Sequence, residues 1–174
     1  KDLIKMATEN ATETLNALQN QWERDKNKQT TALAELQETF KMPQPPNRIE
    51  CYDVSNTQGT AITASMVVFT QGTPTKGHYR RFNIRSVTHK GDDFGSMEEA
   101  LRRRFSRWQS SQEEKETPGK KNDPSFSSLP DLIIVDGGKG QLTRAVVVLE
   151  EFNLMDKIKV AGLAKQNEEL FVPN

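Results

Sequence analysis

The sequence Leu132-Ile133-Ile134-Val135-Asp136-Gly137-Gly138 predicts a short, buried β-strand that ends in a carboxylate and then turns sharply. A second run of the same kind, Arg48-Ile49-Glu50-Cys51-Tyr52-Asp53, lies earlier in the chain. A carboxylate at the end of a buried strand costs several kcal/mol or takes up a proton, unless a positive charge neutralises it. Asp53 and Asp136 together therefore favour a shared metal ion. For either aspartate alone, capping of a strand or helix end is the simpler explanation.

The region after residue 47 alternates between predicted strands and helices. Its first three strands are joined by short turns, which is typical of an antiparallel meander. An amphipathic helix runs from Asp92-Asp93 to Trp108, with arginines on its outer face, and a second follows from about Gly140. The predicted strands cover residues 48–54, 61–69, 78–84, 131–135 and 158–163, and a further short strand begins at Leu170.

This order of elements predicts an α/β fold with a mixed, five-stranded sheet flanked by helices. A right-handed crossover returns the fourth strand to the sheet, and its simplest place is beside the first strand, on the open edge and parallel to it. Asp53 and Asp136 then meet where the strand order reverses, which is where open α/β sheets bind their ligands. The two aspartates are thereby predicted to form a pair.

Residues 1–46 form a separate predicted unit, a helical segment with a proline-rich connector. Its apolar residues are spaced by three and four, but the stretch 23–31 is wholly polar, so one long helix and two shorter helices both fit the pattern. Prolines end the helix from residue 43 onwards. The predicted domains are 1–46 and 47–174, the second truncated at its C-terminus. Within it, the polar residues 109–129 predict a mobile surface insertion.

Composition excludes several classes of protein. The 24 basic and 24 acidic residues balance, so any affinity for nucleic acid must come from local clusters around Arg81 and in the run Arg102-Arg103-Arg104, although a solvated face is the commoner explanation of such runs. A single cysteine, Cys51, excludes an internal disulfide framework. His78 and His89 are expected at the surface. No apolar stretch reaches the roughly 20 residues that span a bilayer, and no signal sequence is visible, so we expect a cytoplasmic protein without a membrane partner.

The predicted aspartate pair suits a hard divalent cation, which prefers oxygen ligands and keeps waters for a substrate to displace. With a phosphodiester as substrate, such a metal polarises the phosphoryl oxygens and supplies a hydroxide for in-line attack. Gly138 and Lys139 add backbone amides and a positive charge at a helix start, where phosphate binds well, although a tight turn alone explains the glycines. Asp93 is a candidate third acidic group and Lys165 a candidate phosphate contact. A helix cap and a solvated strand end are the respective alternatives.

Seven segments of the chain resemble, in the right order, the C-terminal nuclease half of UvrC, the incision subunit of the bacterial UvrABC excision-repair nuclease. The resemblance covers roughly residues 48–173 and is most specific in two segments, Ile49-Glu50-Cys51-Tyr52-Asp53-Val54-Ser55 and Val135-Asp136-Gly137-Gly138-Lys139-Gly140-Gln141-Leu142. The other segments are 57–59, 64–69, 79–82, 91–94 and 162–165. Residues 1–42 are similar to the helical stretch that precedes this domain in the family.

The resemblance implies an RNase H-like fold and a metal-dependent DNA endonuclease. Such an enzyme cuts damaged double-stranded DNA 5′ to the lesion, with Mg²⁺ or Mn²⁺ as cofactor and no small-molecule substrate. Asp53 and Asp136 match the family's two catalytic aspartates, and Asp93 matches a further acidic residue important for this incision.

Other parts of the family's machinery are expected outside this chain. The metal-site histidine and the tandem helix-hairpin-helix motifs that bind DNA would follow Asn174, and the segment that contacts the partner UvrB would precede Lys1. The fragment alone is therefore expected to be incomplete for catalysis. Two departures from the family pattern are Asn56, where many members carry histidine, and the longer insertion at 109–129.

Two functions of other classes compete with this one. A non-catalytic scaffold would grip DNA or a repair partner through the arginine face of the helix after Asp93 and through the N-terminal helix, and its binding would be independent of metal and steeply dependent on salt. A nucleotide-binding module would use residues 137–140, but no Ser or Thr follows Lys139 to hold Mg²⁺.

Overall fold

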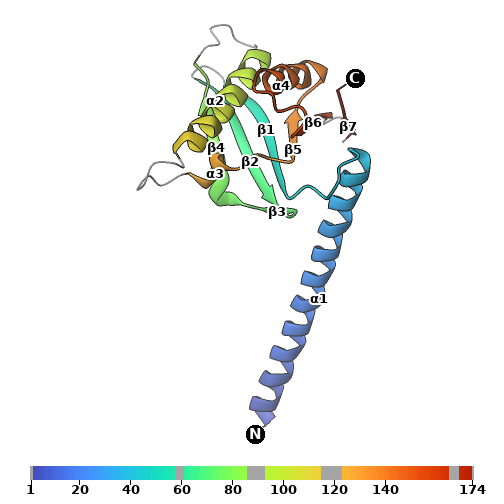
Figure 1. Cartoon of the computed structure of the whole chain (residues 1–174). Helices are drawn as coiled ribbons and strands as arrows, with labels where there is room; N and C mark the ends of the chain where they lie inside the picture. The colour runs from blue at the N-terminus through green and yellow to red at the C-terminus, as the bar shows by residue number, and fades with distance from the viewer. Residues whose placement is uncertain (1, 58–60, 86–92, 115–122, 165–168, 174) are drawn as a thin grey trace. The chain divides into compact units, whose positions relative to one another are not determined.

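The computed structural model describes residues 2–57, 61–85, 93–114, 123–164 and 169–173 (Figure 1). The chain divides into two compact units, Lys1–Pro45 and Pro46–Asn174, and each is described by itself. Across these described ranges, no helix has both the length and the apolar character that crossing a membrane requires.

The first unit is one continuous helix, α1 (Asp2–Thr39). Of the two arrangements compatible with the sequence, the single long helix is therefore the one observed. The polar stretch 23–31 does not interrupt it, because this stretch contains neither glycine nor proline, the two residues that break helices most strongly. Leu15, Leu18 and Trp22 are exposed on α1, by 55%, 59% and 74%.

The second unit is built on a seven-stranded mixed sheet with the order β3-β2-β1-β5-β6-β7, and β4 also pairs with β2. Strands β1, β5 and β6 are parallel to one another, and the remaining pairings are antiparallel. The strands are β1 (Arg48–Thr57), β2 (Ala61–Thr70), β3 (Thr73–Pro74), β4 (Arg80–Asn83), β5 (Leu132–Asp136), β6 (Lys159–Ala164) and β7 (Glu169–Phe171).

The predicted α/β fold and the parallel pairing of β5 with the open edge of β1 are confirmed. The sheet has two strands beyond the predicted five: the further short strand expected from Leu170 is β7, an antiparallel edge, and β3 forms in a segment expected to be a turn. The third predicted strand was too long at its start, since residues Lys76–His78 form a 3₁₀ turn, η1.

Three helices complete the unit: α2 (Asp93–Glu114), α3 (Pro124–Ser127) and α4 (Lys139–Glu151). Figure 1 shows α2 and α4 side by side across one face of the sheet. Their inward residues form one apolar core with alternate strand residues such as Tyr52, Met66 and Val135. The fully or almost fully buried apolar residues of α2 and α4 are Met97, Ala100, Leu101, Phe105, Leu142, Ala145, Val148 and Leu149.

The predicted mobile insertion at 109–129 was wrong at both of its ends. Helix α2 continues to Glu114, and Asp123 caps α3 by accepting a hydrogen bond from the amide of Ser125 at 2.9 Å. Phe126 is only 4% exposed, and its ring meets that of Phe82 edge-on at 6.4 Å. One aromatic side chain thus anchors a segment whose composition is otherwise polar. Residues 115–122 lie outside the described ranges.

Candidate active site

Asp53 and Asp136 occupy equivalent positions on the adjacent parallel strands β1 and β5. The pairing runs from Ile49 opposite Leu132 to Tyr52 opposite Val135, and the two aspartates come next on their strands. Tyr52 and Val135 point into the helix-covered core, so both aspartates lie on the opposite face of the sheet. Adjacent strands are about 4.8 Å apart. The predicted neighbourhood of the two carboxylates therefore exists, although β1 itself continues past Asp53 in its pairing with β2.

A row of polar residues crosses the sheet on this same face. Asp53 pairs with Ser65 of β2, and Ser65 pairs with Arg81 of β4. Directly opposed residues of a sheet share a face, so Arg81, Ser65, Asp53 and Asp136 form one line over four strands. Arg81 is exposed, and the other three are half-buried. The predicted phosphate contact Arg81 is therefore two strands, about 10 Å, from Asp53.

The backbone around Asp53 and Asp136 is held locally. The hydroxyl of Ser55 donates to Oδ2 of Asp53 at 3.1 Å, which restrains that carboxylate. After Asp136, Gly137 has a φ of +147°, a conformation that side chains strongly disfavour. Its amide donates to the carbonyl of Leu163 in β6 at 3.3 Å. This turn sets the start of α4 directly after the second aspartate.

The first turns of α2 and α4 touch each other. Helix α4 follows Gly138, whose own backbone is extended, and Gly138 and Lys139 are both exposed. The ring of Phe94 lies so close to Gly140 that a Cβ there would collide with it. Asp93, the first residue of α2, is thus brought to the region that carries Asp136. Lys165, Asp92 and His89 lie outside the described residues.

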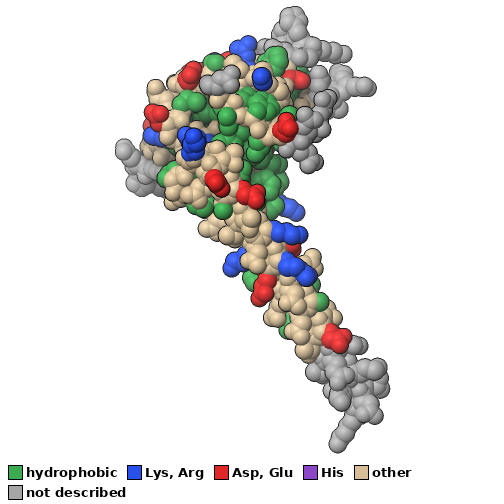
Figure 2. All heavy atoms as spheres, turned by 90° about the vertical axis from the view of Figure 1, so that its right-hand side faces the viewer, with side chains coloured by type: hydrophobic (Ala, Val, Ile, Leu, Met, Phe, Trp, Pro, Cys, Tyr) green, Lys and Arg blue, Asp and Glu red, His purple; other side chains and the backbone are tan. Residues whose placement is uncertain are grey.

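The arginine run of α2 matches the alternative of a solvated face only in part, because Arg102 is exposed, Arg103 is half-buried and Arg104 is completely buried. Arg102 pairs with Glu98 and Glu151. Nη1 of Arg103 donates to Glu99 at 3.1 Å and to the carbonyl of Asn83 at 2.6 Å, and the guanidinium lies 5.6 Å from the centre of the Phe82 ring. Figure 2 shows another face, the one on the right of Figure 1, where side chains of both charge signs are interspersed.

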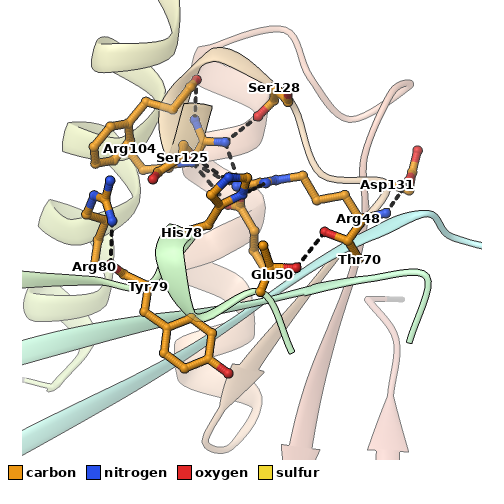
Figure 3. A network of polar contacts seen from close by, with 12 residues as sticks. Arg48, Glu50, Thr70, His78, Tyr79, Arg80, Arg104, Ser125, Ser128 and Asp131 are labelled. Atoms are coloured by element: carbon orange, nitrogen blue, oxygen red, sulfur yellow. Dashed lines mark hydrogen bonds and ion pairs between the residues drawn. The ribbon is translucent and has the colours of Figure 1, made fainter. Parts of the chain in front are cut away.

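Arg104, the third member of the run, is completely buried and pairs with Glu50 of β1, which is also completely buried (Figure 3). Nε and Nη2 of Arg104 donate to the two carboxylate oxygens at 3.1 and 2.8 Å. The remaining donors of Arg104 bond the carbonyls of Phe126 and Ser128. Tyr52 donates its hydroxyl to Oε2 of Glu50 at 2.7 Å. The carboxylate and the guanidinium are thereby satisfied on all sides.

Arg48 extends this buried network towards η1. It donates to Glu50 at 2.9 Å and to the carbonyl of Ser125 at 2.9 Å. Nη1 of Arg48 lies 2.9 Å from Nδ1 of His78, and because guanidinium is only a donor, Nδ1 must accept. Burial, followed by the charges of Arg48 and Arg80, lowers the pKa of His78 below 6.5. The expected surface position of His78 is therefore corrected to a half-buried, neutral one.

Two other groups near Glu50 are held in their protonated forms. Burial, and then the Glu50 carboxylate, raise the pKa of the Cys51 thiol to about 11. The same causes raise the pKa of Tyr52 well above 10, although Arg104 and Arg48 oppose the shift. Cys51 is thus a half-buried thiol without nucleophilic character at neutral pH.

Two patterns in the sequence indicate this network, which the predicted site did not include. Alternation along β1 places Arg48 and Glu50 on the same face as the core residue Tyr52. On α2, the four-residue spacing from Ala100 through Arg104 to Trp108 places Arg104 on the inward side, unlike Arg102 and Arg103.

Comparison with known proteins gives a family match over most of the chain. A family model described as the UvrC RNAse H endonuclease domain matches residues 37–174. The UvrABC system protein C of Carboxydothermus hydrogenoformans is 46% identical over 172 residues, which are 99% of this chain and 27% of that protein. That of Gloeobacter violaceus is 41% identical over 175 residues, covering 99% of this chain and 25% of that protein. The chain thus spans about a quarter of the length of these curated relatives.

Solved structures give a more distant likeness. Ciona intestinalis endonuclease V in complex with DNA aligns with a TM-score of 0.40 and 14% identity, covering 78% of this chain and 55% of that one. Human ENDOV aligns with a TM-score of 0.40 and 14% identity, covering 68% of this chain and 46% of that one.

Proposed function

The chain belongs to the family of the UvrC RNase H endonuclease domain, and from this we propose that it makes the 5′ incision beside a lesion in bacterial nucleotide excision repair. The observation that carries the proposal is the placement of Asp53 and Asp136 at equivalent positions of two adjacent parallel strands. The substrate is damaged double-stranded DNA in the cytoplasm, and UvrB is the partner, engaged through a segment outside this chain.

The residues present fit a Mg²⁺ or Mn²⁺ ion. Asp53 and Asp136 offer hard carboxylate oxygens from one face of the sheet, and Ser55 restrains the first of them. Within the described ranges no third acidic, His or Cys side chain completes a metal-binding cluster with them, which suits an ion that keeps several waters. A cation held there would polarise a phosphoryl oxygen and activate water for in-line attack on the phosphodiester.

Other residues of the chain are proposed to hold the DNA backbone. Arg81 lies in line with the two aspartates, and an arginine presents a fork of donors that matches the oxygens of a phosphate. Gly138 and Lys139 offer the amides and the charge at the start of α4. Asp93, at the start of α2, is proposed as a further acidic residue of the incision, and Lys165 as a phosphate contact.

The scaffold alternative is less well supported by the arrangement of α2. A DNA-binding face needs arginines whose guanidinium groups can contact phosphates instead of other groups of the protein. Arg102 and Arg103 are held by glutamates, and Arg104 is buried. The N-terminal helix is a weak substitute, because residues 11–39 carry acidic as well as basic side chains, and both kinds are visible in Figure 2.

The proposal is tested by Asp136→Asn in the complete protein to which this segment belongs, assayed with its partner proteins on lesion-bearing duplex DNA. The amide keeps the shape and loses the charge, so 5′ nicking and Mn²⁺ binding should both be lost while the circular dichroism spectrum is retained. Asp156→Asn, an exposed aspartate in the turn after α4, is the matched control and should cut normally. Wild-type nicking by Asp136→Asn would refute the proposed function.

A further inference from the structure

The apolar face of α2 does not by itself define where the helix sits along the sheet. Met97, Leu101 and Phe105 are spaced by four residues, and all three are completely buried. If α2 slid by one turn, about 5.4 Å, each large apolar side chain would be replaced by the next. Cores tolerate such exchanges of similar volume well. The apolar contacts therefore discriminate weakly between neighbouring registers.

Arg104 breaks this repeat. It is completely buried, and its guanidinium reaches Glu50 of β1 through two nitrogen atoms, at 3.1 and 2.8 Å. A forked contact has one geometry, unlike a contact between apolar surfaces. A slide by one turn would separate Arg104 from Glu50 and leave each of these two buried charges without its partner. Single buried polar groups fix the register of packed helices in the same way.

The pair links the two elements that carry acidic residues of the proposed site. Glu50 lies three residues before Asp53 on β1, and its side chain is on the opposite face of the sheet. Arg104 lies about three turns, or about 16 Å, after Asp93 on α2. At the start of α2, the ring of Phe94 lies against Gly140, which is at the start of α4. The position of Asp93 relative to Asp53 thus depends on the register of α2.

We propose that Glu50 and Arg104 form a positioning pair that fixes α2 along β1 and thereby places Asp93 for the incision. This inference rests on the proposed function. Both side chains are completely buried away from the site, so in this proposal they act through Asp93. Misplacement of a reacting group by about 1 Å can cost a hundredfold in rate, and a slipped register exceeds that displacement.

The first test is Arg104→Lys in the complete protein, which keeps the charge and removes the fork. We expect kcat for 5′ nicking to fall by about tenfold to a hundredfold, with KM for DNA changed less than about twofold. Arg80→Lys is the matched control, because Nε and Nη2 of Arg80 make a forked contact with Asp123, the exposed residue that caps α3. It should leave kcat unchanged. Equal effects of the two substitutions would contradict the positioning role.

The decisive measurement is a double-mutant cycle with Asp93→Asn. If Arg104 acts through Asp93, Arg104→Lys should lower kcat in the wild-type background and have no further effect in the Asp93→Asn background. Independent, multiplicative effects would overturn the inference, and so would an Asp93→Asn variant that cuts normally. Asp136→Asn is assayed alongside, because wild-type cutting by that variant refutes the proposed function itself.

A milder substitution keeps the test valid if Arg104→Lys does not fold. Tyr52→Phe removes one hydrogen bond to Glu50 and retains the ring. We expect a smaller fall in kcat that is again absent in the Asp93→Asn background. A fall of equal size in both backgrounds would count against the pair as a positioning device.

Discussion

Strand β1 carries two carboxylates within four residues, and the protein treats them in opposite ways. Glu50 faces α2, is completely buried, and accepts hydrogen bonds from Arg48, Arg104 and Tyr52. Asp53 faces the other side of the sheet, is half-buried, and directly follows the last residue paired with β5, as Asp136 does on the neighbouring strand. A carboxylate that accepts hydrogen bonds from guanidinium groups stabilises the folded structure, whereas a carboxylate beside another carboxylate suits the binding of a cation.

The largest effect should come from removing the charge of Asp53. Asp53→Asn is expected to lower kcat for nicking at least about 1,000-fold, equivalent to about 4 kcal/mol of activation free energy. The free energy of unfolding should change by less than about 1 kcal/mol, because loss of one of two neighbouring like charges relieves repulsion. Urea unfolding monitored by circular dichroism, alongside the nicking assay, measures both. A large loss of stability would place Asp53 in the same class as Glu50.

The mirror experiment is Glu50→Gln. The amide leaves two buried arginines without their counter-charge, so the free energy of unfolding should fall by about 3 kcal/mol. Urea unfolding at neutral pH measures the loss. Asp123→Asn is the comparison at the exposed Arg80–Asp123 pair and should cost no more than about 1 kcal/mol. If both substitutions cost the same, burial is not what distinguishes the two carboxylates of β1.

The turn after Asp136 offers an intermediate effect. Gly137→Ala places a methyl group at a φ of +147°, against the side chain of Gln141, and should cost about 2 kcal/mol. Nicking should fall as well, since the turn sets the start of α4. Gly77→Ala is the control, because its Cβ would meet nothing within 4 Å, and it should be nearly neutral. Thermal unfolding of both variants checks this prediction.

The smallest expected effect is a dependence of the free energy of unfolding on pH, which comes from His78. The pKa of His78 in the folded protein is lowered from 6.5 by burial and by Arg48 and Arg80, while Asp123 and Glu50 oppose the shift. The unfolded chain therefore takes up the proton first, and the free energy of unfolding should fall as the pH drops below about 6.5. His78→Gln should reduce this fall between pH 7.5 and 5. An identical pH profile would mean that His78 is as exposed as the sequence predicted.

The arrangement of the central strands could be predicted because it depends on local patterns and on handedness. Short apolar runs gave β1, β2, β5 and β6, and the right-handed crossover placed β5 beside β1. The placement of Asp53 next to Asp136 followed from these two steps alone. Their role as metal ligands stays a prediction.

The buried network could not be predicted with the same ease, because it depends on contacts between distant segments. Arg102, Arg103 and Arg104 have identical side chains, and only the phase of α2 separates the buried one from the others. Glu50, the partner of Arg104, lies on another element. The carbonyls that accept the other hydrogen bonds of Arg104 belong to the segment after Asp123. The composition of that segment is mostly polar, and it does not indicate that the one aromatic residue, Phe126, is buried.

The two tryptophans of the chain are divided between the two units. Trp22 on α1 is 74% exposed, whereas Trp108 on α2 packs against the core. Their fluorescence should therefore differ, with a red-shifted, readily quenched emission from the first and a blue-shifted, protected emission from the second. With Trp22→Phe, Trp108 is the one tryptophan left among these 174 residues, so its emission reports the melting of the second unit in this chain without any attached label.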